Sequence, residues 1–250
     1  MQIDSSTVFI PGATSGIGLG LALRLRAAGS TVIVGGRRTE RLEAIAAEHP
    51  GIGTVEIDTA DPASILRARD EVVARYPELD AVVLMAGIME AEEFKDPASL
   101  EIAERTVVTN LLGPIRLVHA FLPQLRSREA ATIVTVSSGL ASVPLAVTPT
   151  YNATKAAIHS LSETLRVQLE TTGVRVVELV PPATQTDLMG LKDNPTALPL
   201  EDFLDEVVGI LETQPEVAEV LVERVKWQRH AEREGRYDEV FATLSGRYRA

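Results

Sequence analysis

Short apolar runs rich in β-branched residues alternate with longer segments of helical periodicity along most of the chain. The runs predict seven β-strands, at residues 7–10, 31–34, 54–57, 80–85, 132–136, 174–180 and 217–222. Apolar positions recur with helical spacing at residues 19–28, 42–48, 61–76, 99–126, 150–171 and 201–213. Strands that each lead into a helix are typical of a parallel sheet covered on both faces. The pattern therefore predicts an α/β protein with a doubly wound parallel sheet of seven strands.

The regular alternation ends after Pro181. Residues 182–200 contain prolines and polar residues with little periodicity, so we predict a mobile flap there. The tail at about residues 223–250 mixes charged residues with scattered aromatic ones and predicts no definite element. Neither a linker nor an internal repeat sets these segments apart, which favours a single domain over residues 1–250.

The composition is ordinary for a soluble globular protein, with 45% hydrophobic and 24% charged residues. No apolar run reaches about 18 residues and no basic signal-peptide region begins the chain, so we expect a cytoplasmic protein without a membrane span. The absence of cysteine excludes disulfides, thiolate metal sites and a cysteine nucleophile. The four histidines lack metal-ligand spacing, so no metal is expected. A net charge of −11 argues against a nucleic-acid partner or an anionic membrane surface.

A glycine-rich turn joins the first predicted strand to the first helix. Its glycines, Gly12, Gly16 and Gly18, have the spacing G-x-x-x-G-x-G. Gly12 permits a tight turn, while Gly16 and Gly18 let the backbone approach a pyrophosphate at the helix N-terminus. A glycine turn alone is often only a turn. With a strand before it and a helix and strand after it, the segment predicts a dinucleotide-binding unit of the Rossmann fold.

Two arginines follow the second predicted strand, where dinucleotide sites often carry an acidic residue that binds the ribose hydroxyls. Arg37 and Arg38 suit a 2′-phosphate instead, and therefore favour NADP(H) as the cofactor. The alternative is that Arg37, Arg38 and Arg41 form a solvated helix start.

Tyr151 and Lys155 are four residues apart, so on a helix they share one face. A neighbouring ammonium is expected to lower the pKa of the phenol, which could then exchange a proton with an alcohol or carbonyl oxygen. Ser138 ends the fifth predicted strand and could hold the same oxygen. Taken alone, the five residues from Tyr151 to Lys155 are more typical of a surface Tyr–Lys pair on a helix. Their context decides between the two, because Gly12, Asp58, Gly87, Ser138 and Pro181 all fall at strand C-terminal ends, where such sheets bind ligands.

These motifs together resemble the short-chain dehydrogenase/reductase family over residues 5–222. The resemblance rests on the glycine turn, Asp58, Ala86-Gly87, Asn110, Ser138, Tyr151-x-x-x-Lys155 and Pro181-x-x-x-x-Thr186. Three further runs are most similar to the DltE-like branch of that family, at residues 137–141, 148–155 and 231–240.

The resemblance implies roles for the site residues. Tyr151 would be the general acid/base, and Lys155 would lower its pKa and hold the nicotinamide ribose. Ser138 would fix the substrate oxygen, and Asn110 would hold a water that links Lys155 to solvent. Asp58 would contact the adenine and Thr186 the nicotinamide carboxamide. The implied cofactor site comprises Gly12, Ser15, Gly16, Ile17, Gly18, Arg37, Arg38, Asp58, Ala86, Gly87, Tyr151, Lys155, Pro181, Thr184 and Thr186.

The implied activity is hydride transfer between NADP(H) and a small-molecule carbonyl or alcohol, of class EC 1.1.1.-. The alternative is a catalytically silent protein of the same fold that binds the dinucleotide as a sensor or scaffold. The family resemblance also implies a homodimer or homotetramer that pairs the helices at residues 99–126 and 150–171.

Three positions depart from the family pattern. Pro11, Met85 and Pro182 stand where relatives usually have Thr, Asn and Gly. Because relatives tie two strand ends together through the Thr and the Asn, we expect Pro11 and Met85 to pack together and replace that polar contact by burial. Pro182 would stiffen the start of the flap.

Overall fold

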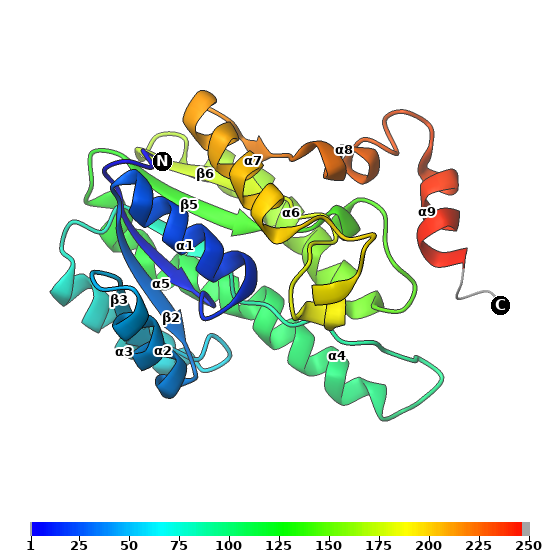
Figure 1. Cartoon of the computed structure of the whole chain (residues 1–250), viewed down its shortest axis with the longest axis horizontal. Helices are drawn as coiled ribbons and strands as arrows, with labels where there is room; N and C mark the ends of the chain where they lie inside the picture. Colours follow the sequence, from blue (N-terminus) through cyan, green and yellow to red (C-terminus); the bar gives the residue numbers. More distant parts are fainter. Residues whose placement is uncertain (1, 247–250) are drawn as a thin grey trace.

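Seven parallel strands form the centre of the structure, a computed structural model that describes residues 2–246 (Figure 1). They are β1 (Thr7–Pro11), β2 (Thr31–Gly36), β3 (Gly53–Glu56), β4 (Ala81–Leu84), β5 (Ala131–Val136), β6 (Val174–Leu179) and β7 (Glu219–Val220). The strand order is β3-β2-β1-β4-β5-β6-β7, and every neighbouring pair is parallel. The prediction of a doubly wound, seven-stranded parallel sheet is confirmed.

Helices cover both faces of this sheet. They are α1 (Gly16–Ala28), α2 (Thr39–Glu48), α3 (Pro62–Arg75), α4 (Ser99–Val107), α5 (Gly113–Arg126), α6 (Pro149–Leu169), α7 (Leu200–Thr213), α8 (Glu223–Arg229) and α9 (Tyr237–Ser245). Three shorter segments are the π-helical η1 (Val108–Leu112) and the 3-10 helices η2 (Gly139–Ala141) and η3 (Leu188–Asp193). The helix predicted at residues 99–126 is therefore interrupted at η1, and the seventh strand is shorter than predicted.

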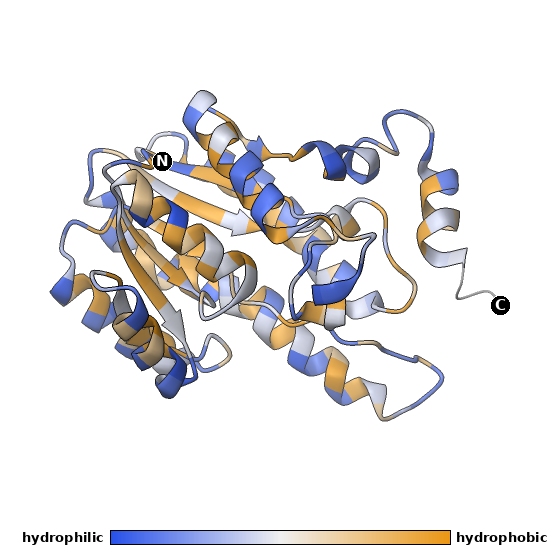
Figure 2. Ribbon diagram, viewed as in Figure 1, coloured by the Kyte–Doolittle hydropathy of each residue, from blue (hydrophilic) through white to orange (hydrophobic). Residues whose placement is uncertain are grey.

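Most strand residues are hydrophobic, as the orange ribbons in Figure 2 show. Val8 and Ile10 of β1 belong to the core beneath α1, α2 and α7, whereas Phe9 belongs to the core beneath α3, α5 and α6. The ring of Phe9 packs against Phe121 of α5, with 5.3 Å between centroids. Strands buried on both faces explain why the sequence shows continuous apolar runs instead of alternation.

The predicted flap, residues 182–200, is folded back on itself in the structure. Gln185 N–H donates to the carbonyl oxygen of Leu198 at 2.8 Å, and Thr184 pairs with Leu198 as an isolated bridge. Met189 adopts a left-handed φ of 54°, which is unfavourable for a residue with a side chain. The mobility of this segment stays a prediction.

The predicted tail forms α8 and α9, and its last residues, 247–250, lie outside the described part of the chain. Val143 is fully buried against Ala231 and Val240, and the hydroxyl of Ser245 accepts a hydrogen bond from the N–H of Ala146 at 3.0 Å. The tail therefore covers the segment that follows Ser138, although its own sequence predicted no element.

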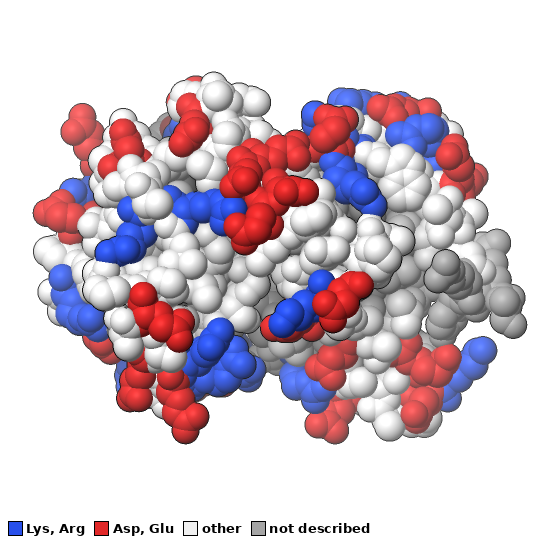
Figure 3. All heavy atoms as spheres, viewed as in Figure 1, with Lys and Arg blue, Asp and Glu red and all other residues white. Residues whose placement is uncertain are grey.

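The exterior carries charges of both signs. On the face shown in Figure 3, acidic and basic side chains are interspersed. One such group joins Arg24 of α1 to Glu201 and Asp205 of α7, with both oxygen–nitrogen distances at 2.8 Å. Among the described residues, every helix is too short or too polar to cross a membrane.

Candidate functional site

The glycine turn after β1 lies directly against the end of β4. Gly12 has a φ of +90°, and a Cβ at this position would lie 2.5 Å from Cα of Ala86. A Cβ on Gly18 would lie 2.8 Å from Cα of Ala13 and 2.9 Å from Cγ of Met85. The backbone of the turn is therefore as close to its neighbours as atoms allow. Met85 packs beneath Gly18, and the expected contact between Met85 and Pro11 stays a prediction.

We expect Gly12→Ala to destabilise the fold, because the new methyl group would meet backbone atoms and φ would remain in the left-handed region. Such strain costs about 1–3 kcal/mol. Gly209→Ala is the matched control, since nothing lies within 4 Å of a Cβ built there. Urea unfolding should show a lower free energy of unfolding for Gly12→Ala alone. Equal stability of Gly12→Ala and the wild type would contradict this packing.

The N-terminus of α1 has the features of an anion site. Its N-cap residue, Ser15, makes no capping hydrogen bond with its side chain, so the backbone N–H groups of the first turn are available to a ligand. Thr186 comes close to this turn, because a Cβ on Gly16 would lie 3.4 Å from its Cγ2. Ile17 follows Gly16 in the same first turn. The structure thus brings together the glycine turn and the first part of the predicted flap.

Arginines that follow β2 lie beside the glycine turn. Arg38 Nη2 donates to Oγ1 of Thr14 at 3.0 Å, and Arg41 Nε donates to the carbonyl oxygen of Thr14 at 3.3 Å. All three arginines from Arg37 to Arg41 are exposed to solvent. Arg38 and Arg41 are therefore tied to the turn and are not purely solvated, while the binding of a 2′-phosphate by Arg37 and Arg38 stays a prediction.

Asp58 follows β3 and is half-buried. One carboxylate oxygen accepts the N–H of Ala60 at 2.9 Å, and the backbone N–H of Asp58 donates to Oγ of Ser64 at 2.9 Å. These bonds fix the Asp58 side chain at the C-terminal edge of the sheet, next to β2. Its predicted contact with adenine stays a prediction.

Ser138, Tyr151 and Lys155 meet in the interior, and each is less than a tenth exposed. Ser138 and Tyr151 face each other, with the Ser138 hydroxyl close enough to the phenol to influence its pKa. Lys155 Nζ lies 5.5 Å from the centroid of the Tyr151 ring and donates to the carbonyl oxygen of Val136 at 2.8 Å. β5 supplies Ser138 at its exit, and the first two turns of α6 supply Tyr151 and Lys155. The surface-pair alternative for Tyr151 and Lys155 is therefore wrong.

The expected lowering of the Tyr151 pKa by Lys155 is wrong for this structure. Burial raises the pKa of Tyr151 to about 12, although the hydrogen bond from Ser138 opposes the rise. Burial also lowers the pKa of Lys155 to about 8. The Lys155 ammonium points to a backbone carbonyl and lies beside the ring, so desolvation outweighs its attraction for a phenolate. At neutral pH the phenol carries its proton and Lys155 is mostly charged.

Asn110 lies in η1, the π-helical turn between α4 and α5, and its side chain is buried. Oδ1 accepts the N–H of Ile88 at 2.8 Å, and Nδ2 donates to the carbonyl oxygen of Ile88 at 2.7 Å. A Cβ on Gly87 would lie 3.4 Å from Oδ1 of Asn110 and 3.8 Å from Nζ of Lys155. Asn110 therefore fixes the exit of β4 beside Lys155, while its role in a water relay stays a prediction.

The remaining predicted cofactor residues lie after β6. Pro181 accepts the N–H of Gly139 at 2.9 Å, so the β6 exit is tied to the segment that follows Ser138. Thr184 is buried, and its hydroxyl donates to the carbonyl oxygen of Pro182 at 3.1 Å. Both positions border the site from the side of the predicted flap.

Sequence reasoning missed three residues at the site. Thr14 holds Arg38, buried Glu92 binds the start of α6, and Gln228 of α8 lies against Gly139, where a Cβ would be 2.6 Å from its Oε1. Thr14 lies inside a recognised motif, but its partner is 24 residues away. Glu92 and Gln228 lie in segments without periodicity or motif, so no local signal identified them.

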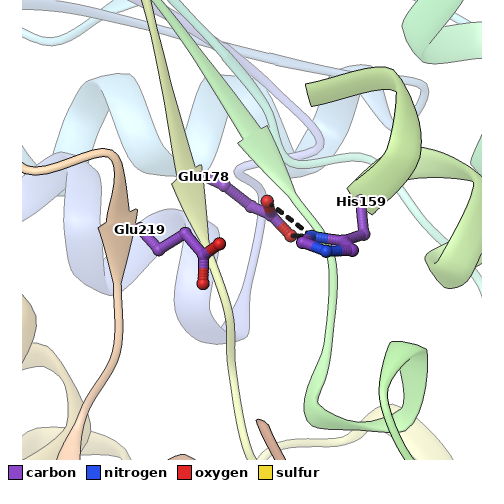
Figure 4. A group of neighbouring side chains, drawn as sticks. All are labelled: His159, Glu178 and Glu219. Atoms are coloured by element: carbon purple, nitrogen blue, oxygen red, sulfur yellow. Dashed lines mark hydrogen bonds and ion pairs between the residues drawn. The ribbon is translucent and has the colours of Figure 1, made fainter. Parts of the chain in front are cut away.

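A second polar cluster begins one turn of α6 after Lys155 (Figure 4). His159 of α6, Glu178 of β6 and Glu219 of β7 offer ligand atoms within 4.8 Å of one another. Arg229 of α8 donates to both oxygens of Glu219, at 2.8 and 2.9 Å, and its Nη2 lies 3.2 Å from Nε2 of His159. Arg229 thus ties α8 to the sheet edge, and Arg166 adds a second guanidinium to the cluster, 3.5 Å from Oε2 of Glu178.

The pKa of His159 is raised, chiefly by its hydrogen bond to Glu178, from an ordinary value of 6.5. A raised folded-state pKa adds stability below the unfolded value, and this contribution is lost as pH rises through the folded value. We therefore expect the stability advantage of the wild type over His159→Gln to be larger at pH 6 than at pH 9, by at most about 1 kcal/mol in this partly exposed setting. Urea unfolding at both pH values measures it, and an advantage that grows with pH would contradict it.

Comparison with known proteins places the whole arrangement in a family. The family described as short chain dehydrogenase matches residues 6–196. An uncharacterized oxidoreductase DltE from Bacillus subtilis is 36% identical over 98% of both chains, which confirms the predicted likeness to the DltE-like branch. A sulfoacetaldehyde reductase from Chromohalobacter salexigens is 32% identical over 90% of this chain and 96% of its own.

The fold has solved counterparts as well. A short chain dehydrogenase from Burkholderia cenocepacia in complex with NADP superimposes with a TM-score of 0.82, at 25% identity, over 98% of this chain and 99% of its own. Other structures of the same fold are complexes with NADH or NAD. The match to the family, the full-length relatives and the shared fold agree, and the chain belongs to the short chain dehydrogenase family of oxidoreductases.

Proposed function

We propose that the protein is an NADP(H)-dependent oxidoreductase that interconverts a small carbonyl compound and its alcohol. The observation that carries the proposal is the buried group formed by Ser138, Tyr151 and Lys155 at the C-terminal edge of the sheet. Two hydroxyls that face each other, with a cation one turn away, suit proton exchange with a single substrate oxygen.

The residues around the group fit a dinucleotide. The uncapped N-terminus of α1 suits the pyrophosphate, and the close packing of Gly12 against Ala86 and of Gly18 against Ala13 holds the turn that leads into it. Arg38, held by Thr14, suits a 2′-phosphate, and Arg37 is exposed next to it. Asp58, Gly87 and Thr186 would border the adenine and nicotinamide ends. NADP(H), when bound, supplies or accepts the hydride.

The chain's own residues would donate the proton to the substrate oxygen and accept it in the reverse direction. In the reductive direction, the substrate oxygen would accept hydrogen bonds from the Ser138 and Tyr151 hydroxyls. The phenol, protonated at neutral pH because burial raises its pKa to about 12, would give its proton to that oxygen as the carbonyl carbon is reduced. The phenolate left behind would be stabilised by Ser138 and by the ammonium of Lys155.

A quaternary arrangement is also proposed. Leu100 of α4, Leu112 of η1 and Val167 of α6 are exposed apolar residues on the helices through which we expect homodimers or homotetramers to form. Sedimentation velocity tests this proposal.

A substrate panel tests the proposed activity. Small aldehydes, ketones and alcohols, including sulfoacetaldehyde and 3-hydroxy acids, are offered with NADPH or NADP, and the absorbance of NADPH is followed. Turnover of at least one compound is expected. The catalytically silent alternative predicts tight NADPH binding without any turnover, and the presence of Asn110, Ser138, Tyr151 and Lys155 together speaks against it.

A further inference from the structure

A buried carboxylate from another segment binds the first turn of the helix that carries Tyr151. Glu92, which lies between β4 and α4, is only 4% exposed. Its Oε1 accepts the backbone N–H of Thr150 at 3.1 Å, and its Oε2 accepts the Thr150 hydroxyl at 2.5 Å. The N–H of Glu92 donates to the carbonyl oxygen of Val147 at 2.9 Å. Glu92 is thus tied to the residue immediately before Tyr151.

The start of α6 needs such a partner. Its N-cap residue, Thr148, makes no capping hydrogen bond with its side chain, and its first turn contains no acidic residue. Helix N-termini leave N–H groups unsatisfied and favour a negative charge. Glu92 supplies both the acceptor and the charge from a distance of 58 residues in sequence.

The segment that carries Glu92 is itself fixed at two other points. Both backbone polar groups of Ile88 are bonded by Asn110. Both carboxylate oxygens of Glu90 accept from Nη2 of Arg105 in α4, at 2.9 Å. Residues 88–92 therefore form a continuous link from Asn110, across the exit of β4, to the first turn of α6. A buried carboxylate that loses its hydrogen-bond partners destabilises the fold. The link therefore favours the one position of the helix start in which the bonds of Glu92 to Thr150 are made.

We propose that Glu92 is a positioning residue that sets the direction of the Tyr151 hydroxyl by fixing the first turn of α6. The inference rests on the proposed function, in which Tyr151 exchanges a proton with the substrate oxygen. A displacement of a catalytic group by about 1 Å can lower the rate of the chemical step by up to about a hundredfold. Loss of the two bonds to Thr150 would let the helix start shift and weaken the contact between Tyr151 and Ser138.

The test compares kcat, the KM for NADPH and hydrogen exchange in residues 149–153. Glu92→Gln keeps the shape of the side chain but loses the charge and one acceptor oxygen, so kcat should fall roughly tenfold to a hundredfold. The KM for NADPH should stay within about twofold, and exchange in the first turn of α6 should speed up. Glu104→Gln, an exposed change on α4, is the matched control and should change none of these.

Variants at Thr150 keep the inference testable if Glu92→Gln folds poorly. Thr150→Val removes the hydroxyl bond to Glu92 and should lower kcat by a smaller factor than Glu92→Gln does. Thr150→Ser keeps the hydroxyl and should have the kcat of the wild type. A folded Glu92→Gln with wild-type kcat would overturn the inference, and so would equal kcat for Thr150→Val and wild type. If Tyr151→Phe still abolishes turnover in that case, the proposed function stands. A wild type that turns over no substrate would overturn both.

Discussion

Tyr151→Phe is expected to lower turnover at least ~100-fold, the usual scale of general acid–base catalysis, while the protein stays folded and binds NADPH. The substitution removes only the hydroxyl, which is the atom that the structure places against Ser138. The ring that remains can still fill the buried space beside Lys155. Steady-state rates and NADPH fluorescence titration, measured on the same preparations, separate loss of chemistry from loss of binding.

The matched control for this variant is Tyr76→Phe. It removes a phenolic hydroxyl at the end of α3, where Tyr76 meets Arg75 and not Ser138 or Lys155. Turnover by the control should equal that of the wild type. Near-full activity of a folded Tyr151→Phe would show that another group moves the proton.

NADPH should bind about ten- to hundredfold more tightly than NADH, because hydrogen bonds to a charged group contribute roughly 1.5–3 kcal/mol. This expectation rests mainly on Arg38, since Thr14 holds its guanidinium at the glycine turn. Arg38→Ala should weaken NADPH binding and leave NADH binding almost unchanged. Arg37→Ala should act in the same direction.

Arg67→Ala serves as the control for the arginine variants, because Arg67 is an exposed arginine on α3 whose partner is Asp61. Titration of each variant with NADPH and with NADH gives the two dissociation constants. Equal or tighter binding of NADH by the wild type would rule out the assignment of Arg37 and Arg38 to a 2′-phosphate.

Much of the fold could be predicted from the sequence because it depends on local periodicity. Strands buried on both faces leave continuous apolar runs, and each of the seven runs corresponds to a strand. The interruption at η1 was not predicted, since one extra residue in a helical turn hardly changes the spacing of apolar positions. β7 is shorter than its apolar run, because burial of Val222 against α8 and the core does not require strand pairing.

The candidate site was predictable where it depends on motif spacing and not where it depends on burial or distant contacts. The separation of Tyr151 and Lys155 indicated one helix face, and the structure confirms it. The same spacing could not reveal that both groups are desolvated, so the direction of the Tyr151 pKa was wrong. The bond between Glu92 and Thr150 joins segments 58 residues apart, and neither segment carries a pattern that identifies the other.

The central claim is that this chain transfers a hydride from NADPH to a carbonyl carbon while Tyr151 supplies the proton. Its most direct test uses NADPH in which both hydrogens of the reactive ring carbon are replaced by deuterium, with a carbonyl compound that the wild type consumes. Mass spectrometry of the alcohol product should show one deuterium on the former carbonyl carbon, formed by the wild type and at least ~100-fold more slowly by Tyr151→Phe. An alcohol without deuterium, or labelled alcohol formed equally fast by Tyr151→Phe, would contradict the account.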